Sequence, residues 1–194
     1  MKSIPTAISE EITLSDGVIT LKPYDEEDLP ILWAAAQESV AWTERWLPWC
    51  RADLTLEKER RWLNLQKTAW SERREFGFAI WTANLETYLG GIGLNYLDWE
   101  QRSANVGYWI RASRIGQGIA PAAVRLMAQF AFFTLDLDRL DILVDPANYA
   151  SRRVAEKVGA VEVGVIPSPL PPESGQSRVC YQLYRNHRKS IEQT

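Results

Sequence analysis

The sequence predicts an α+β domain in which helices flank a mixed, mostly antiparallel sheet. Three strand-like runs, at residues 76–82, 88–99 and 105–110, follow one another with only short turns between them, as in an antiparallel meander. A helical pattern from Ala120 to Thr134 then separates the third run from a short apolar run at 140–144, which is typical of a crossover between two parallel strands. The chain has 194 residues and is 46% hydrophobic, enough for one domain with a sizeable core.

The N-terminal third predicts a strand followed by two helices. Residues 1–17 show little periodicity and suit an arm or a short first strand, whereas residues 18–24 alternate as a strand does. Asp25 and Thr55 are expected to cap the two helices, the second running from Leu56 to about Arg73. The apolar stripes expected to face the core are Leu29, Leu32, Trp33 and Ala36 in the first helix, and Trp62, Leu65 and Ala69, with Leu63 and Trp70, in the second.

The C-terminal third predicts a helix and two strands. The helix runs from Tyr149 to Val158 and ends at Gly159, a residue type favoured just after a helix. A strand at 160–166 and a final strand at 178–184 enclose a proline-rich loop. With no internal repeat and no long linker, we expect a single domain over 1–194, with its core at about 18–185, an arm at 1–17 and a tail at 186–194.

Composition excludes several classes of function. A net charge of −3 argues against general nucleic-acid binding, which needs a basic face. The lack of a long apolar run or a signal peptide predicts a cytoplasmic protein without a membrane partner. Cys50, Cys180 and His187 are too few for a usual zinc site, so no metal is expected, and a disulfide or a histidine-based nucleophilic mechanism is disfavoured.

The segment from Ser113 to Pro121 is the strongest candidate for a binding site. It follows the third strand of the meander and leads into a helix, where first-turn N–H groups lack partners within the helix. Gly116 and Gly118 allow a ligand to approach the backbone, and Arg114 adds a positive charge. The segment therefore suits a phosphate. It is not a P-loop, because no Gly-Lys-Ser/Thr follows, and it is not a Rossmann fingerprint, because position 121 is proline instead of the third glycine.

Three tryptophans, Trp42, Trp46 and Trp49, lie within eight residues of each other. They suit either a hydrophobic plug at one end of the core or an aromatic wall for a substrate. They also suit a partner surface, which makes a homodimer a possible assembly.

Three stretches resemble the GNAT acetyltransferases, and more narrowly the RimJ/RimL-type branch that acetylates the N-termini of ribosomal proteins. They are residues 107–110 (Gly-Tyr-Trp-Ile), residues 115–120 (Ile-Gly-Gln-Gly-Ile-Ala) and residues 148–160. The last contains the pattern Asn-x-x-Ser-x-x-x-Ala-Glu-Lys-x-Gly, about thirty residues after the glycine loop. The resemblance covers about residues 18 to 185 and implies the GNAT fold.

The resemblance implies that acetyl-CoA binds with its pyrophosphate on the glycine loop and its pantetheine arm along the end of the preceding strand. Family members usually carry Arg or Gln three residues before the first glycine, where this chain has Ser113, so Arg114 would supply the charge. The implied acetyl-CoA-binding residues are Trp109, Ile110, Arg111, Arg114, Ile115, Gly116, Gln117, Gly118, Ile119, Ala120, Asn148 and Ser151.

The resemblance also implies catalytic roles. Ser151 would protonate the departing CoA thiolate, with Tyr149 as a second donor, although Asn148 and Ser151 also suit a simple helix cap. A carboxylate must take the proton of the incoming amine. Glu173 in the proline-rich loop is the first candidate, with three alternatives: Asp98, Glu100 and Glu44. Many relatives carry Glu near position 105, where this chain has Asn105, which cannot take a proton.

The expected function is transfer of an acetyl group from acetyl-CoA to a primary amine, either a protein N-terminus or a small amine, by direct attack in a ternary complex. Trp42, Trp46 and Trp49 would then shape the acceptor side. The alternative is a domain of the same fold that binds an acyl-CoA or a partner without catalysis.

Overall fold

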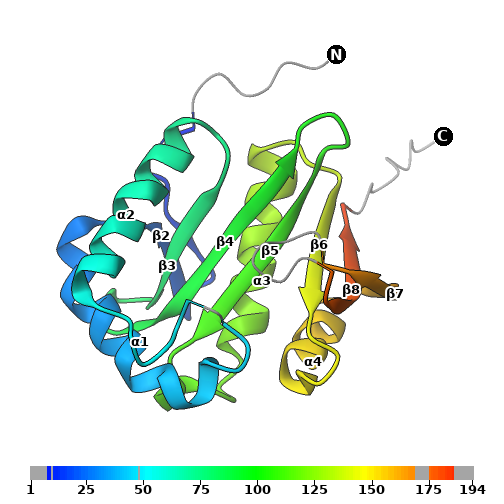
Figure 1. Cartoon of the computed structure of the whole chain (residues 1–194). Helices are drawn as coiled ribbons and strands as arrows, with labels where there is room; N and C mark the ends of the chain where they lie inside the picture. Colours follow the sequence, from blue (N-terminus) through cyan, green and yellow to red (C-terminus); the bar gives the residue numbers. More distant parts are fainter. Residues whose placement is uncertain (1–7, 10, 48, 169–174, 186–194) are drawn as a thin grey trace.

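The computed structural model describes residues 8–9, 11–47, 49–168 and 175–185. Within these residues the strands form one sheet, and the helices lie on its two faces (Figure 1). The strands are β1 (Leu14–Ser15), β2 (Ile19–Pro23), β3 (Phe76–Thr82), β4 (Tyr88–Asp98), β5 (Ser103–Ile110), β6 (Arg139–Val144), β7 (Val161–Pro167) and β8 (Ser177–Tyr184). The α-helices are α1 (Leu29–Thr43), α2 (Leu56–Ser71), α3 (Ile119–Gln129) and α4 (Tyr149–Lys157), with short helical turns at Glu26–Asp28, Ala112–Arg114 and Phe130–Thr134.

The sheet confirms the predicted mixed, mostly antiparallel arrangement. Its strand order is β1-β2-β3-β4-β5-β6-β8-β7. The pair β5–β6 is parallel, joined by the crossover through α3, and each other neighbouring pair is antiparallel. Of the two possibilities for the N-terminal segment, the structure has a short strand, β1, paired with β2.

Alternate residues of the strands supply two cores. On one face, Phe76 and Phe78 of β3 pack edge-to-face on Phe130 at the end of α3, with ring centroids 5.6 Å and 5.3 Å apart. On the other face, Ala79 and Trp81 of the same strand join a cluster with Leu29 and Leu32 of α1 and Leu63 of α2. The second face, under α1 and α2, also carries the large cavity described below.

The predicted inward face of α2 is wrong in one position. Leu63, Ala69 and Trp70 are buried, but Leu65 is 58% exposed. Successive residues of an α-helix are rotated by about 100°, so Leu65 lies on the side opposite Leu63. The predicted caps are confirmed: Thr55 Oγ1 accepts a hydrogen bond from the Lys58 amide at 3.2 Å, and Asp25 Oδ1 accepts one from the Glu27 amide at 3.1 Å, opening the helical turn before α1.

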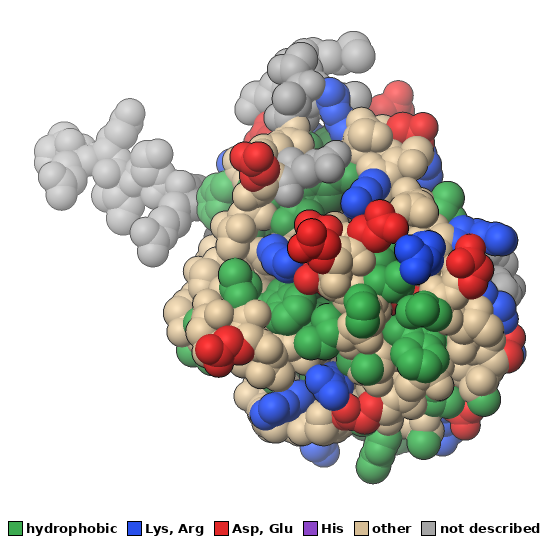
Figure 2. Space-filling model, turned by 90° about the vertical axis from the view of Figure 1, so that its left-hand side faces the viewer, with side chains coloured by type: hydrophobic (Ala, Val, Ile, Leu, Met, Phe, Trp, Pro, Cys, Tyr) green, Lys and Arg blue, Asp and Glu red, His purple; other side chains and the backbone are tan. Residues whose placement is uncertain are grey.

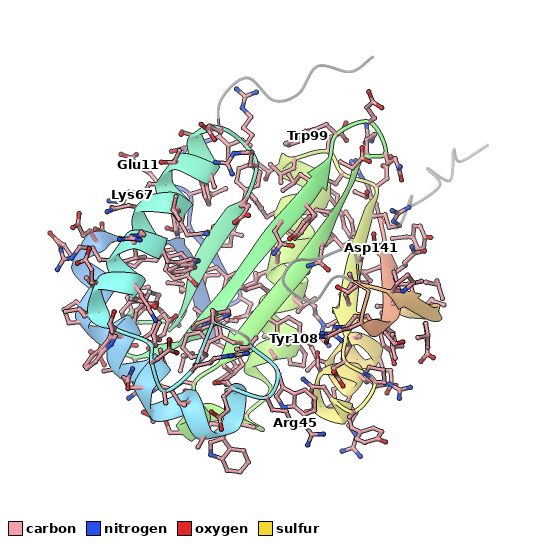
Figure 3. The ribbon with its side chains drawn as sticks, viewed as in Figure 1. Glu11, Arg45, Lys67, Trp99, Tyr108 and Asp141 are labelled. Atoms are coloured by element: carbon pink, nitrogen blue, oxygen red, sulfur yellow. The ribbon has the colours of Figure 1, made fainter. Side chains whose placement is uncertain are left out.

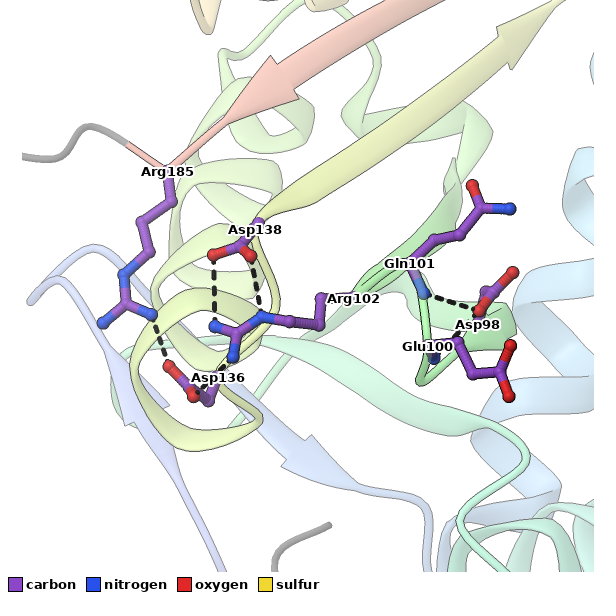
Figure 4. Close-up of polar contacts among 7 residues, drawn as sticks. All are labelled: Asp98, Glu100, Gln101, Arg102, Asp136, Asp138 and Arg185. Carbon is purple, nitrogen blue, oxygen red and sulfur yellow. Dashed lines mark hydrogen bonds and ion pairs between the residues drawn. The ribbon is translucent and has the colours of Figure 1, made fainter. Parts of the chain in front are cut away.

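Charged side chains hold together the end of the sheet where β5 and β6 begin (Figure 4). Arg102, just before β5, binds Asp136 and Asp138 in the turn that leads into β6, at 2.9 Å and 2.7 Å. Arg185, after β8, binds Asp136 as well. This network ties together three segments that are far apart in sequence, at the end of β5 opposite the glycine loop.

The described residues contain no helix whose length and apolar content would suffice to cross a membrane. Within the same residues, no group of three or more His, Cys, Asp or Glu side chains is arranged to hold a metal ion. His187 lies outside the described residues. Cys50 and Cys180 are both buried, free thiols.

Candidate active site

The glycine loop between β5 and α3 is open on its outer side. Gly116 and Gly118 have φ of +80° and +78°, and a Cβ at either position would meet no atom within 4 Å. Gly118 is the residue that caps α3. Within the described part of the chain, no group accepts a hydrogen bond from the amides of residues 116–120. Left-handed glycines thus turn a row of free amides outward at the start of a helix, which is an anion-binding arrangement.

The turn that enters this loop is tethered to α1. Glu38 accepts hydrogen bonds from Arg111 Nε at 2.7 Å and from the Ser113 amide at 3.0 Å. The neighbouring Ser39 Oγ accepts one from the Ala112 amide at 3.0 Å. The hydrogen bonds from Arg111 and Ser113 lower the pKa of Glu38 to about 2. Arg111, one of the predicted acetyl-CoA-binding residues, therefore has its side chain engaged with α1.

Beyond their first residues, β5 and β6 separate. Their pairing runs from Ser103↔Arg139 to Asn105↔Asp141 and ends there, so the last residues of β5 pair only with β4. The Arg111 amide donates to Leu89 on the β4 side. Because amides alternate in direction along a strand, the Ile110 amide points the other way, into the gap between β5 and β6. The gap thus offers unpaired strand backbone next to the glycine loop.

Asn148, Ser151 and Tyr108 meet across this gap. Asn148 Oδ1 accepts a hydrogen bond from the Ser151 amide at 3.1 Å, so the helix-cap role weighed for Asn148 is present. The Ser151 hydroxyl remains free of that cap, and its Oγ lies 2.8 Å from the Tyr108 hydroxyl. Figure 3 shows Tyr108 on the side of β5 toward α4. Burial raises the pKa of Tyr108 to about 12, so this hydroxyl stays protonated near neutral pH.

Tyr149, the second predicted proton donor, lies on the exposed surface at the start of α4. It is 66% exposed, and its ring centroid lies 6.0 Å from the guanidinium of Arg152. The tyrosine hydroxyl beside Ser151 is that of Tyr108.

A cavity of about 740 Å³ lies between α2, the segment before it and the sheet. Its floor is a row of glycines: Gly77 of β3 pairs with Gly93 of β4, and Gly93 pairs with Gly107 of β5. Without side chains, these positions leave a trough, which is open over Gly107 and covered over Gly77 by Gln66 and Tyr24. The trough reaches Tyr108 and Trp109, at the end of β5 beside the glycine loop.

The walls of the cavity are aromatic and carry one buried carboxylate. Tyr24 and Trp62 meet edge-to-face with centroids 4.8 Å apart, and Trp49 and Trp109 do so at 5.5 Å. Glu59 of α2 lines the same cavity and is 5% exposed. Burial raises the pKa of Glu59. The cavity therefore combines aromatic rings with a buried carboxylate, and its lining extends to Trp109 near the end of β5.

Comparison with known proteins assigns the family. Residues 19–161 match the family model described as the acetyltransferase (GNAT) domain. The chain belongs to the GNAT acetyltransferase family. The resemblance stated from the sequence is thereby confirmed at the level of family and fold.

Relatives of this GNAT chain include a Bacillus subtilis (strain 168) protein named "Probable N-acetyltransferase YjcK". It is 32% identical over 118 residues, which cover 59% of this chain and 65% of that protein. In that protein and four further curated relatives, the matched part spans 41% to 65% of their length.

Solved structures that share the fold include the following two. An acetyl transferase from Salmonella typhimurium, described as modifying the N-terminal serine of ribosomal protein L7/L12, has a TM-score of 0.77 at 19% identity, covering 87% of this chain and 96% of its own. Mycobacterium smegmatis RimJ in complex with a CoA disulfide has a TM-score of 0.73 at 22% identity, covering 95% and 91%.

The three tryptophans that were predicted to shape the acceptor side of this GNAT domain have different surroundings. Trp49 is 44% exposed and lines the cavity. Trp42 is 68% exposed, and Trp46 packs under the guanidinium of Arg45 with the cation 4.7 Å from the ring centroid. Figure 2 shows the face that carries α1 and α2, where hydrophobic side chains lie among interspersed acidic and basic ones.

The carboxylates considered as general bases lie away from the cavity or outside the described residues. Glu173 is in the part of the chain that the structure leaves undescribed. Asp98 accepts hydrogen bonds from the amides of Glu100 and Gln101, in the turn between β4 and β5 (Figure 4). Glu44 is exposed after the end of α1, and Glu100 is exposed in the β4–β5 turn. Each of these three described residues is absent from the cavity wall.

Sequence reasoning missed Tyr108 as a partner of Ser151 and Glu59 as a cavity group. Tyr108 stood within a stretch already quoted for the resemblance, but its contact with α4 depends on the separation of β5 from β6. Glu59 was not singled out from the sequence. Its place on the buried stripe, four residues before Leu63, is the pattern that could have identified it.

Proposed function

We propose that this protein transfers an acetyl group from acetyl-CoA to a primary amine, such as the α-amino group of a protein or a small amine. The single observation that carries the proposal is the glycine loop, whose free amides stand at the start of α3 and directly beside the gap between β5 and β6. Membership of the GNAT family supports it, as do the N-acetyltransferase names of the curated relatives.

In this proposal the pyrophosphate of CoA lies against the amides of the glycine loop, and the pantetheine arm runs along the unpaired edge of β5. The Ile110 amide points into the gap and stabilises the negative charge that develops on the thioester oxygen. Ser151 donates a hydrogen bond or a proton to the departing thiolate. Tyr108 holds the Ser151 hydroxyl in place at 2.8 Å.

For the acceptor, relatives with the same fold point to peptide N-termini. The Salmonella typhimurium protein is described as modifying an N-terminal serine of a ribosomal protein. We propose the same class of acceptor for this chain, with the cavity beside Trp49 and Trp109 as the place where the amine enters.

The test is the release of free CoA, measured with a thiol reagent. Purified protein should release CoA from acetyl-CoA in the presence of a peptide with N-terminal serine or of spermidine. The same peptide with an acetylated N-terminus is the control and should give only background hydrolysis. If CoA binds but no amine in such a panel raises its release above background, the protein would be a binding module of the same fold. Thermal-shift titration with CoA identifies that case, because a ligand stabilises the folded state whether or not it reacts.

A further inference from the structure

Glu59 is the most deeply buried charged group of the cavity. It is 5% exposed, and within the described residues its carboxylate has no hydrogen-bond or ion-pair partner. The other two carboxylates on the cavity wall are engaged: Asp53 pairs with Lys58 at 2.7 Å, and Glu75 accepts a hydrogen bond from Gln66 at 3.2 Å. An unpartnered buried carboxylate is costly to the fold, so its presence in a cavity points to a ligand.

The surroundings of Glu59 are rich in groups that respond to its charge. The pKa values of Tyr24, Tyr88 and Cys50 are raised first by burial and further by the negative charge of Glu59. Tyr24 follows β2, Tyr88 begins β4 and Cys50 lies between α1 and α2, so the charge of Glu59 acts on uncharged groups from three separate parts of the chain. Arg51 also lines the cavity, but it is exposed and forms no ion pair with Glu59.

The shape of the cavity suits a cation on an extended chain. Six aromatic side chains line its walls, Tyr24, Trp62 and Tyr88 among them, and aromatic faces attract ammonium ions. At the β5 end of the glycine trough, a Cβ at Gly107 would meet only Asn95 Nδ2 at 3.9 Å, which gives the rest of the acceptor room there. The same trough ends at β5, where the acetyl group would arrive.

We propose that Glu59 binds the ammonium group of the acceptor in this cavity and removes its proton before acetyl transfer. This inference rests on the proposed function and names the acceptor class: a primary amine that arrives as a cation, attached to a slim segment that fits over glycines. The chain therefore uses a carboxylate on α2 as its base.

The ammonium ion gives one proton to Glu59, and the free amine nitrogen attacks the carbonyl carbon of acetyl-CoA. The new C–N bond forms and the C–S bond breaks, with the electron pair leaving on sulfur. The thiolate takes a proton from Ser151, the second proton of the nitrogen restores the Ser151 hydroxyl, and Glu59 returns the first proton to solvent. The products are the acetylamide, free CoA and one proton.

The test compares Glu59→Gln with Glu57→Gln, a matched control on the same turn of α2 whose side chain is 74% exposed. In CoA-release assays with spermidine and with the N-terminal serine peptide, Glu59→Gln should lower kcat/KM for the amine by about 100-fold or more. The Kd for CoA, from calorimetry, should stay within about twofold, since the glycine loop is untouched. Raising the pH toward about 10 should restore part of the activity of Glu59→Gln, because solvent then deprotonates the amine.

A second measurement needs no turnover. Trp49, Trp62 and Trp109 line the cavity, so their fluorescence should report a small cation that enters it. Titration with n-butylammonium chloride should saturate in the wild type and in Glu57→Gln, and the Kd should rise at least about tenfold in Glu59→Gln. Neutral n-butanol should not distinguish the three proteins.

The outcomes separate the two proposals. If the wild type releases no CoA with any amine, the proposed function fails, and the n-butylammonium titration alone decides the role of Glu59 as the cation-binding group. If the wild type is active but Glu59→Gln matches Glu57→Gln in kcat/KM, in pH profile and in n-butylammonium binding, the role of Glu59 is overturned.

Should Glu59→Gln fail to fold, Glu59→Asp replaces it. Its shorter side chain retracts the carboxylate and should raise KM for the amine more than it lowers kcat, whereas unchanged kinetics would overturn the role.

Discussion

The hydroxyl of Tyr108 lies 2.8 Å from Oγ of Ser151, and this contact joins the separated end of β5 to the first turn of α4. The Ser151 amide is at the same time held by Asn148. The amide and the hydroxyl of Ser151 thus have different partners, and in the proposed function this hydroxyl acts on the departing thiolate of CoA.

We expect Ser151→Ala to lower kcat by about 10- to 100-fold, with little change in KM for acetyl-CoA, because the proton donor is lost while the loop is intact. Tyr108→Phe should lower kcat less, and the double variant should be no slower than Ser151→Ala, since Tyr108 acts through Ser151. Steady-state kinetics of CoA release measure all three, with Tyr96→Phe at an exposed position as control. An additive loss in the double variant would mean that Tyr108 acts independently.

The glycine loop predicts a loss of CoA binding that is distinct from a loss of folding. Gly118→Val places a β-branched residue at φ +78°, which strains the loop and blocks the approach of phosphate. Gly17→Val is the matched control, because Gly17 has φ +85° and equally open surroundings, in the turn between β1 and β2. Both should lower the melting temperature similarly, but only Gly118→Val should weaken CoA in calorimetry, by at least about tenfold. Equal CoA affinity in both variants would mean that the pyrophosphate binds at another place.

The contacts that tether α1 to the glycine loop predict a smaller loss of CoA affinity. Glu38→Gln removes the charge that binds Arg111 and weakens the acceptor for the Ser113 amide. We expect the Kd for CoA to rise about three- to tenfold, because the loop must then be ordered by the ligand itself. The pKa of Glu38 is lowered to about 2, so its carboxylate is ionised throughout the range in which binding can be measured. The effect should therefore be the same at about pH 5 and about pH 8, and a loss confined to one of them would contradict the tether.

The glycine trough predicts that acceptor use can be impaired without harming the fold. A Cβ at Gly107 would meet only Asn95 Nδ2, at 3.9 Å, so Gly107→Ala fits without a clash and fills part of the trough. We expect KM for the amine to rise about tenfold, with the melting temperature and CoA affinity nearly unchanged. At Gly91 a Cβ would overlap the Tyr24 hydroxyl, so Gly91→Ala should lower the melting temperature as well. An unaltered KM in Gly107→Ala would place the acceptor outside the trough.

Glu59 also predicts how stability changes with pH. Its pKa is raised in the folded state by burial, so the folded protein holds this proton more tightly than the unfolded chain does. The resulting stabilisation is complete below the unfolded pKa, near about 4.3, and is lost as pH rises through the higher folded value. At about pH 8, Glu59→Gln should therefore melt at a higher temperature than the wild type, and the difference should shrink toward pH 4. Thermal unfolding of both proteins across this range is the measurement, and a lower melting temperature for Glu59→Gln at pH 8 would contradict the assignment.

Local patterns in the sequence were enough to predict most of the elements. The alternation of the meander, the caps Asp25, Thr55 and Asn148, and the glycine loop before α3 each depend on neighbours within a few residues, so their physics is readable along the chain. The inward face of α2 was predicted less well, because Leu65 is apolar yet lies on the solvent side of the helix.

The sequence by itself determined the α+β order of elements, the open loop at the start of α3 and the membership of the GNAT family, because each is a local or linear property. Only the tertiary structure decided that Gly77, Gly93 and Gly107 lie in register, that Tyr108 reaches Ser151, and that Glu59 is buried in the cavity they adjoin. Strand register and helix docking bring together residues far apart in the chain, and these depend on the packing of the whole core rather than on neighbours in sequence.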